Sequence, residues 1–330
     1  MTVLVTGGAG YVGSHMLLAL KDAGEPAVAL DDLSLGSRDL IPKEVPLIVG
    51  SVGDRALVAK TLKEHGIADV IHFAGSTHVR ESLERPLAYY RNNTANTIAL
   101  LEASVAAGLK RFIFSSTAAV YGEPESSPVS EDAPPRPITP YGASMAMSER
   151  IVADAAAARG FAHMTLRYFN VAGADRELRT GETGKPTHLV KVAAQIAVGA
   201  RREKLQIFGS DYPTPDGTAI RDYIHVTDVA EAHLSALQAM RRNGRSATLN
   251  VGYGRGYSVC EVVMSVERVT GARIPREFAP RRAGDPPQLI ADCAEARKTL
   301  DWSPRFDDID FIVRSAIDWE KKLAKGAPKA

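Results

Sequence analysis

Gly7-Gly8-Ala9-Gly10-Tyr11-Val12-Gly13 directly follows an apolar segment, Thr2–Thr6, and opens a helical pattern. Glycines are needed where such a strand-to-helix turn is tight, where backbone approaches a diphosphate, and where helix packs on strand. The N–H groups at the start of the helix can then hold phosphate oxygens. Asp31 lies 18 residues after Gly13, at the end of the second apolar segment. A carboxylate there would bind ribose hydroxyls and repel a 2′-phosphate, so the motif predicts a dinucleotide site that takes NAD rather than NADP.

Short apolar segments alternate with helix-like stretches from residue 1 to about residue 170. Continuous rather than alternating apolarity is typical of a parallel sheet whose two faces are covered by helices. Beyond Asn170 come Gly- and Pro-rich loops, a helix from about Thr227 and a terminal helix near Asp308–Lys325. The predicted strands are Thr2–Thr6, Ala27–Leu30, Asp69–Phe73, Arg111–Ser115, His163–Tyr168, Asp222–Val226 and Ala247–Val251.

This pattern predicts an α/β protein with a doubly wound parallel sheet and a smaller α/β lobe. We expect the sheet domain to contain residues 1–169 and 221–251, and the smaller lobe to contain residues 170–220 and 252–330.

Composition excludes several classes of protein. The chain has 330 residues, 40 Lys and Arg against 39 Asp and Glu, and a net charge of +1, so no bulk field favours nucleic acid or anionic lipid. No apolar run approaches the roughly 20 residues that cross a bilayer. The two cysteines, Cys260 and Cys293, form no Cys/His cluster, so we expect no metal site. Few cysteines and no signal-peptide pattern at the start favour the reducing cytoplasm.

A hydroxyl cluster and a tyrosine are predicted to meet at the sheet edge. Ser115-Ser116-Thr117 ends a predicted strand, and Tyr141 opens the helical run Tyr141–Arg159. Ligands of open α/β sheets bind at the carboxyl ends of the strands, so this pair suits proton transfer. A tyrosine with a pKa near 10 is a poor base at neutral pH and needs nearby positive charge.

These motifs together make the chain resemble the extended short-chain dehydrogenase/reductase family, within it the UDP-hexose 4-epimerase group. The resemblance extends over almost the whole length and rests on Gly7–His15, Val70–Gly75, Phe112–Thr117, Leu166–Asn170, Arg221–Val226 and Ala279–Asp285. It implies a Rossmann domain with resident NAD and a smaller nucleotide-sugar-binding lobe.

The resemblance also implies a reaction, the interconversion of UDP-glucose and UDP-galactose in galactose metabolism. Tyr141 would take the proton of the sugar 4-hydroxyl as hydride passes to NAD, and Thr117 would hydrogen-bond the same oxygen. The 4-keto sugar would then turn over and receive the hydride on its other face. Binding energy would come mainly from the nucleotide, which leaves the sugar loose enough to rotate.

Site residues follow from the same resemblance, position by position. For NAD they are Gly7, Gly10, Tyr11, Val12, Asp31, Ser51, Val52, Phe73, Ala74, Gly75, Asn93, Ser115, Tyr141 and Tyr168. For the UDP-sugar they are Thr117, Tyr141, Asn170, His188, Leu189, Arg221, Arg282, Asp285 and Leu289. The family also implies a homodimer through helices near residues 86–107 and 141–159.

Met145 is the most important departure from the family pattern, because the family carries a catalytic lysine four residues after the tyrosine. No lysine occurs between Lys110 and Lys185, and Arg150 is too far along the helix to replace it. Methionine has no charge, so we expect impaired catalysis with preserved packing.

Three further positions also differ from the family. Ser51 stands where an acidic residue often lies beneath the adenine, and Thr77 where some members carry a phosphate-facing lysine. Leu289 occupies the position that controls room for a C2 N-acetyl group, so substrate breadth stays open.

Two alternatives remain at this point. One is another NAD-dependent nucleotide-sugar modifier, such as a UDP-hexosamine or UDP-uronate 4-epimerase or a dehydratase. The other is a catalytically silent protein that binds NAD or a nucleotide sugar, which the loss of the lysine at Met145 would suit.

Overall fold

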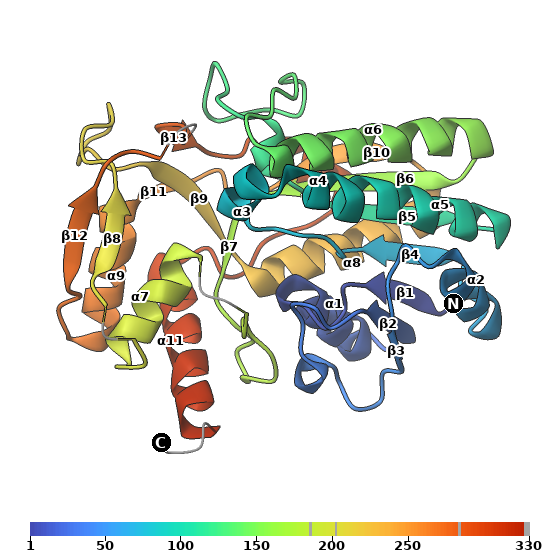
Figure 1. Ribbon diagram of the computed structural model, residues 1–330, viewed down its shortest axis with the longest axis horizontal. Coiled ribbons are helices and arrows are strands. Elements are labelled where there is room, and N and C mark those ends of the chain that lie inside the picture. Colours follow the sequence, from blue (N-terminus) through green and yellow to red (C-terminus); the bar gives the residue numbers. More distant parts are fainter. Residues whose placement is uncertain (185–186, 202, 283–284, 327–330) are drawn as a thin grey trace.

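A parallel sheet of seven strands forms the larger lobe of the computed structural model, which describes residues 1–184, 187–201, 203–282 and 285–326 (Figure 1). The strand order is β10-β6-β5-β4-β1-β2-β3, and every neighbouring pair is parallel. The chain direction across the sheet reverses between β1 and β4, where α/β proteins form a ligand crevice. The strands are β1 Val3–Thr6, β2 Ala27–Asp31, β3 Leu47–Val49, β4 Asp69–His72, β5 Arg111–Thr117, β6 Ala162–Tyr168 and β10 Ala247–Val251.

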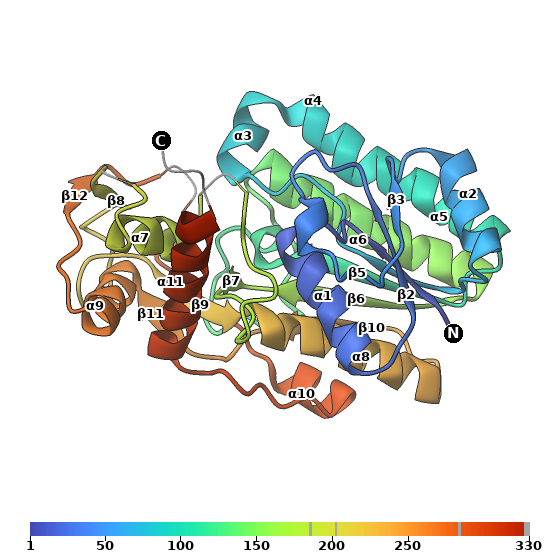
Figure 2. The same cartoon turned by 90° about the horizontal axis from the view of Figure 1, so that it is seen from below.

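Helices cover both faces of this sheet, which confirms the predicted doubly wound arrangement (Figures 1 and 2). Helices α1 (Tyr11–Asp22) and α8 (Val226–Asn243) pack side by side on one face. Helices α2 (Arg55–Glu64), α5 (Asn96–Ala106) and α6 (Pro140–Arg159) pack on the other. Shorter turns of helix are η1 Arg38–Leu40, α3 Val79–Glu84, α4 Pro86–Tyr89, η2 Tyr90–Ala95, η3 Ala118–Val120 and α10 Ala294–Leu300.

The smaller lobe is built around β9 (Ile220–His225), which pairs with β7 (Asn170–Ala172), β11 (Gly256–Ser258) and β13 (Gln288–Leu289). A separate parallel pair joins β8 to β12, and three helices pack beneath the strands. These elements are β8 Leu205–Phe208, β12 Arg276–Ala279, α7 Leu189–Ala197, α9 Val259–Thr270 and α11 Ile309–Gly326.

One boundary differs from the expected division of the chain. Residues 221–251 are expected in the larger domain, but of that segment only α8 and β10 pack in or against its sheet. Strand β9 lies in the sheet of the smaller lobe, because its backbone pairs with β7, β11 and β13. The chain therefore crosses between the lobes at His225 and Val226, where β9 runs directly into α8.

Local sequence sets the ends of the helix that carries the tyrosine. Thr139 accepts a hydrogen bond from Gly142 N at 3.2 Å, and Pro140 occupies the first turn, where its missing N–H costs nothing. The helix ends at Gly160, whose φ of 76° is left-handed and favours glycine. Tyr141 is thereby held in the first turn of α6, at the carboxyl end of β5.

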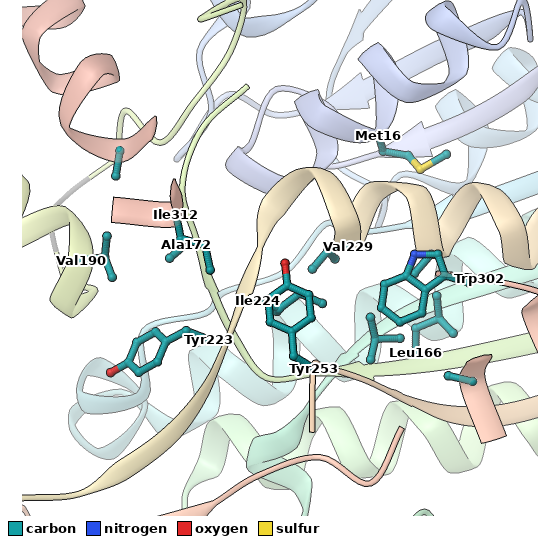
Figure 3. Packing of buried hydrophobic residues seen from close by; sticks show 14 of the residues in the cluster. Met16, Leu166, Ala172, Val190, Tyr223, Ile224, Val229, Tyr253, Trp302 and Ile312 are labelled. Carbon is teal, nitrogen blue, oxygen red and sulfur yellow. The ribbon is translucent and has the colours of Figure 1, made fainter. Parts of the chain in front are cut away.

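The two lobes share one buried apolar core. Figure 3 shows part of it, with Leu166 of β6 from the larger lobe and Val190 of α7, Tyr223 of β9 and Ile312 of α11 from the smaller lobe. Each of these side chains is almost fully buried. Packing of buried side chains from both lobes therefore holds the two lobes together.

Candidate active site

One large cavity, about 1570 Å³ in volume, opens along the carboxyl ends of the larger sheet and continues between the lobes. Its walls carry residues that precede α1, that follow β2, β4, β5 and β6, and that belong to the smaller lobe. This volume exceeds the usual range of about 300–1,000 Å³ for small-molecule sites, as two ligands bound side by side would require.

The glycine turn has the shape that a diphosphate needs. Gly7 has a φ of 70°, and a Cβ there would lie 2.6 Å from Ala74 N. A Cβ on Gly13 would lie 2.1 Å from the Gly7 carbonyl oxygen. No side chain caps the start of α1 at Gly10, so the first N–H groups of the helix face the cavity. The turn therefore fits a dinucleotide diphosphate.

Asp31 is anchored by backbone and presents its carboxylate to the cavity. Its two oxygens accept hydrogen bonds from Ala9 N at 2.9 Å and Leu33 N at 2.8 Å. Burial raises the pKa of Asp31 above its usual value, and these two N–H groups oppose the rise. A carboxylate oxygen can accept more than one hydrogen bond, so Asp31 retains capacity for ribose hydroxyls.

Most of the predicted NAD positions line the same cavity. Two do not, and each lies behind the wall. Asn93 bonds Ser76 N at 2.7 Å, Ser76 O at 3.0 Å and Ser144 Oγ at 3.0 Å, which fixes the loop after β4. Ser115 donates to Tyr168 Oη at 3.1 Å. The residues that line the cavity are Gly7, Gly10, Tyr11, Val12, Asp31, Ser51, Val52, Phe73, Ala74, Gly75, Tyr141 and Tyr168.

Tyr141 and Thr117 both line the cavity. Tyr141 is 8% exposed and stands edge-on to the ring of Tyr89, with the ring centroids 6.4 Å apart. Burial raises the pKa of Tyr141 above its usual value near 10; Tyr168 and Tyr89 add to the rise, and the Thr117 hydroxyl opposes it. All of these groups are neutral at pH 7, so within the described residues no cation favours the phenolate.

Met145 does not line the cavity. It lies one turn after Tyr141 on α6, is 9% exposed, and belongs to the apolar cluster that contains Tyr141 and Val152. The side chain therefore fills core space, as expected for a residue that preserves packing.

Neither nearby arginine replaces the missing lysine. Arg150 points into solvent and bonds Asp154 through Nε at 2.8 Å. Arg167 is buried, but its charge is matched by Glu149, whose Oε2 lies 2.6 Å from Arg167 Nη2. This placement agrees with the expectation that Arg150 lies too far along the helix.

The predicted UDP-sugar residues line the part of the cavity that faces the smaller lobe. Arg221 pairs with Asp285, and Arg282 stacks on Phe208 with its guanidinium carbon 3.9 Å from the ring centroid. His188 bonds Glu182 through Nδ1 at 2.9 Å. The residues in this group are Asn170, His188, Leu189, Arg221, Arg282, Asp285 and Leu289.

Sequence reasoning missed several residues of the cavity wall, because they belong to no motif. Arg80 and Tyr89 come from the segment after β4, and Phe208 ends β8. The sequence indicates Arg80 only by its charge and by its position shortly after the predicted cofactor residues Phe73–Gly75.

The described ranges lack two classes of feature. No helix there is long and apolar enough to cross a membrane. No group of three or more His, Cys, Asp or Glu side chains in those ranges could hold a metal ion.

Comparison with known proteins gives a consistent match. Residues 3–252 match the model of the NAD dependent epimerase/dehydratase family. The chain is 56% identical over 329 residues to UDP-glucose 4-epimerase of Azospirillum brasilense, covering 99% of this chain and 94% of that protein.

Two solved structures are similar over almost the whole chain. One is UDP-glucose-4-epimerase from Stenotrophomonas maltophila with bound NAD and formylated UDP-arabinopyranose, with a TM-score of 0.95 and 40% identity, covering 99% of this chain and 100% of that chain. The other is UDP-glucose 4-epimerase from Bifidobacterium longum in complex with NAD⁺ and UDP, with a TM-score of 0.93, 37% identity and the same coverage.

Proposed function

The chain belongs to the NAD dependent epimerase/dehydratase family, and on this basis we propose that it interconverts UDP-glucose and UDP-galactose at C4, with a rate lowered by Met145. The proposal is supported by relatives that carry the name UDP-glucose 4-epimerase and by solved relatives with NAD and UDP ligands. Tyr141 and Thr117 at the centre of a two-ligand cavity fit this chemistry.

The larger lobe holds NAD in this proposal. The glycine turn and the start of α1 bind the diphosphate, and Asp31 binds the adenosine ribose. NAD supplies the hydride acceptor and donor for C4. The smaller lobe binds the nucleotide of the UDP-sugar through Arg221, Arg282 and the residues around them.

Tyr141 acts as the base and the acid. Its phenolate oxygen takes the proton of the 4-hydroxyl, and the Thr117 hydroxyl hydrogen-bonds the same sugar oxygen. Tyr141 later returns the proton when C4 is reduced on the opposite face. The sugar must rotate between the two half-reactions, so the enzyme holds the nucleotide tightly and the sugar weakly.

The single observation that carries the rate proposal is the buried Tyr141, which no cation among the described residues assists. Purified protein should therefore convert UDP-galactose to UDP-glucose slowly at neutral pH and faster at alkaline pH. Chromatographic separation of the two UDP-sugars after incubation tests this. Absence of UDP-glucose at every pH would refute slow epimerisation.

The same incubation discriminates the two rival functions. A different nucleotide-sugar product would indicate another modifying enzyme. Unchanged UDP-galactose together with calorimetric binding of UDP and NAD would indicate a silent binding protein, the rival that Met145 favours.

The C2 substituent that the site accepts is a further part of the proposal. Leu289 of β13 is 8% exposed and lines the cavity. Leucine is smaller than an aromatic side chain, so we propose that the site accepts UDP-N-acetylhexosamine beside UDP-hexose. A Leu289→Tyr variant should lose the N-acetyl substrate selectively.

We also propose that the protein is a homodimer through α4, α5 and α6. Leu87 of α4 is 75% exposed, and Ile98 of α5 and Met147 of α6 are also exposed apolar side chains on these adjoining helices. Equilibrium sedimentation of a Met147→Glu variant should give a lower mass than that of the unaltered chain. Monomeric mass for both would refute the assembly.

The cytoplasm is the proposed compartment. Cys260 and Cys293 are both free thiols, as expected under reducing conditions.

A further inference from the structure

Arg80 of the larger lobe and Arg282 of the smaller lobe line the same cavity. Arg80 is exposed in α3 and lines the cavity, and Arg282 lines it between β12 and β13. Desolvation lowers the pKa of Arg282 below its usual value, Asp285 opposes this, and the positive charge of Arg80 lowers it further. The two guanidinium groups are therefore close enough to repel each other.

Neither of these arginines is neutralised by a carboxylate in the described part of the chain. Arg221 is paired with Asp285, and the carboxylate beside Arg80, Glu81, is occupied by Arg85 and by the hydroxyl of Tyr89. Arg282 rests on the ring of Phe208. Two unmatched like charges that interact within one cavity favour an anion bound between them.

Charge balance indicates which anion fits. The diphosphate of a UDP-sugar carries one negative charge on each phosphate. Arg221 pairs with Asp285 and Arg281 pairs with Asp211, so Arg282 is the one of these three neighbouring cavity arginines whose charge no carboxylate matches, and it balances half of the diphosphate charge. Arg80 supplies a second positive charge, from the larger lobe's side of the same cavity.

We propose that Arg80 binds the diphosphate of the UDP-sugar together with Arg282, so that the two lobes grip it from opposite sides. This inference rests on the proposed function, because it assigns a further residue to the UDP-sugar site. The planar guanidinium forms paired hydrogen bonds with phosphate oxygens, and it keeps its charge at every physiological pH. Arg80 is a binding residue and takes no part in proton transfer.

Calorimetry with UDP-glucose tests the role of Arg80. Arg80→Ala should weaken binding about tenfold or more, the scale of a charged hydrogen bond, and Arg80→Lys should weaken it less. Arg282→Ala should weaken it to a similar extent. Arg91→Ala is the matched control, because Arg91 is exposed in the neighbouring segment η2 and does not line the cavity. Its affinity should stay unchanged.

Three results would overturn the inference. Affinity of Arg80→Ala equal to that of the control, with Arg282→Ala weakened, would remove Arg80 from the site. Loss of copurified NAD from Arg80→Ala at unchanged UDP-glucose affinity would assign Arg80 to the cofactor. Weakened binding of UDP-glucuronate but not of UDP-glucose would assign it to a C6 carboxylate. Failure of the unaltered chain to bind UDP-glucose would instead refute the proposed function.

Discussion

A lysine at residue 145 should restore the missing charge beside Tyr141. Residues 141 and 145 lie on one face of α6, about 6 Å apart along the helix axis at ~1.5 Å per residue. The ammonium of a Met145→Lys variant would approach the phenolic oxygen and the cofactor ribose. It would favour the phenolate, which no cation among the described residues favours now.

The size of the effect follows from the pKa of the tyrosine. A nearby opposite charge lowers a pKa by about 1–3 units, and below the pKa each unit raises the phenolate fraction about tenfold. We therefore expect Met145→Lys to raise the neutral-pH rate by about 10- to 1,000-fold. The lysine replaces a methionine that is 9% exposed in an apolar cluster, so it should also lower the free energy of unfolding. That cost is about 1–3 kcal/mol.

Steady-state rates with UDP-galactose from pH 6 to pH 10 provide the assay. The rate of the unaltered chain should climb steadily with pH, and that of Met145→Lys should level off at lower pH. Met145→Leu is the matched control, because leucine fills the same apolar site without charge. It should stay within about twofold of the unaltered chain.

Two results would refute this reasoning. Equal rates for the unaltered chain and Met145→Lys near neutral pH would show that the cavity activates Tyr141 by another route. An equal gain in Met145→Leu would show that packing, not charge, limits the rate.

The remaining predictions concern the cofactor, the nucleotide and acid stability. Asp31→Ala should reduce the NAD that copurifies with the protein and allow NADP to bind, which identification of the heat-released nucleotide measures; exclusive retention of NAD would contradict it. Arg221→Ala should weaken UDP binding by about 1.5–3 kcal/mol, because it removes a charged hydrogen bond and leaves the Asp285 carboxylate unpaired near the phosphates; calorimetry that gives unchanged affinity would exclude Arg221 from the site. Burial lowers the pKa of His15, His72, His225 and His233 to between about 3 and about 4, below the unfolded value of 6.5. Their contribution to the free energy of unfolding is therefore complete above pH 6.5 and is lost as the pH falls toward 4. Urea unfolding at pH 7, 6 and 5 should show this loss, and His72→Gln should reduce the slope by about 1.4 kcal/mol per pH unit; an unchanged slope would show that His72 is not the group that titrates.

Local sequence was sufficient for the parts of the fold that depend on local chemistry. The glycine turn requires positive φ at Gly7 and no Cβ at Gly13, and only glycine meets both demands. Continuous apolar segments such as β5 and β6 were recognisable because both faces of the sheet are covered. Strand β3, Leu47–Val49 at the sheet edge, is also apolar but only three residues long, and it was missed.

Features that depend on distant partners could not be predicted in this way. The expected division assigns residues 221–251 to the larger domain, but β9 pairs with strands of the smaller lobe, whose segments come before and after it along the chain. The same limit applies to the site. Arg80 and Arg282 are separated by about two hundred residues, and only folding brings their charges into one cavity.

The apolar core that joins the lobes makes them a single cooperative unit of unfolding. One cluster contains both Leu166 of the larger lobe and Val190 of the smaller lobe, so neither lobe retains the complete core by itself. A ligand that binds the glycine turn therefore adds its binding free energy to the stability of β9 and α11 as well. A destabilising substitution in the shared core, far from the cavity, acts through the same linkage between folding and binding. A cavity-forming substitution at Ile312 in the last helix would lower the occupancy of both ligands by raising the unfolded fraction, without changing any atom that touches them.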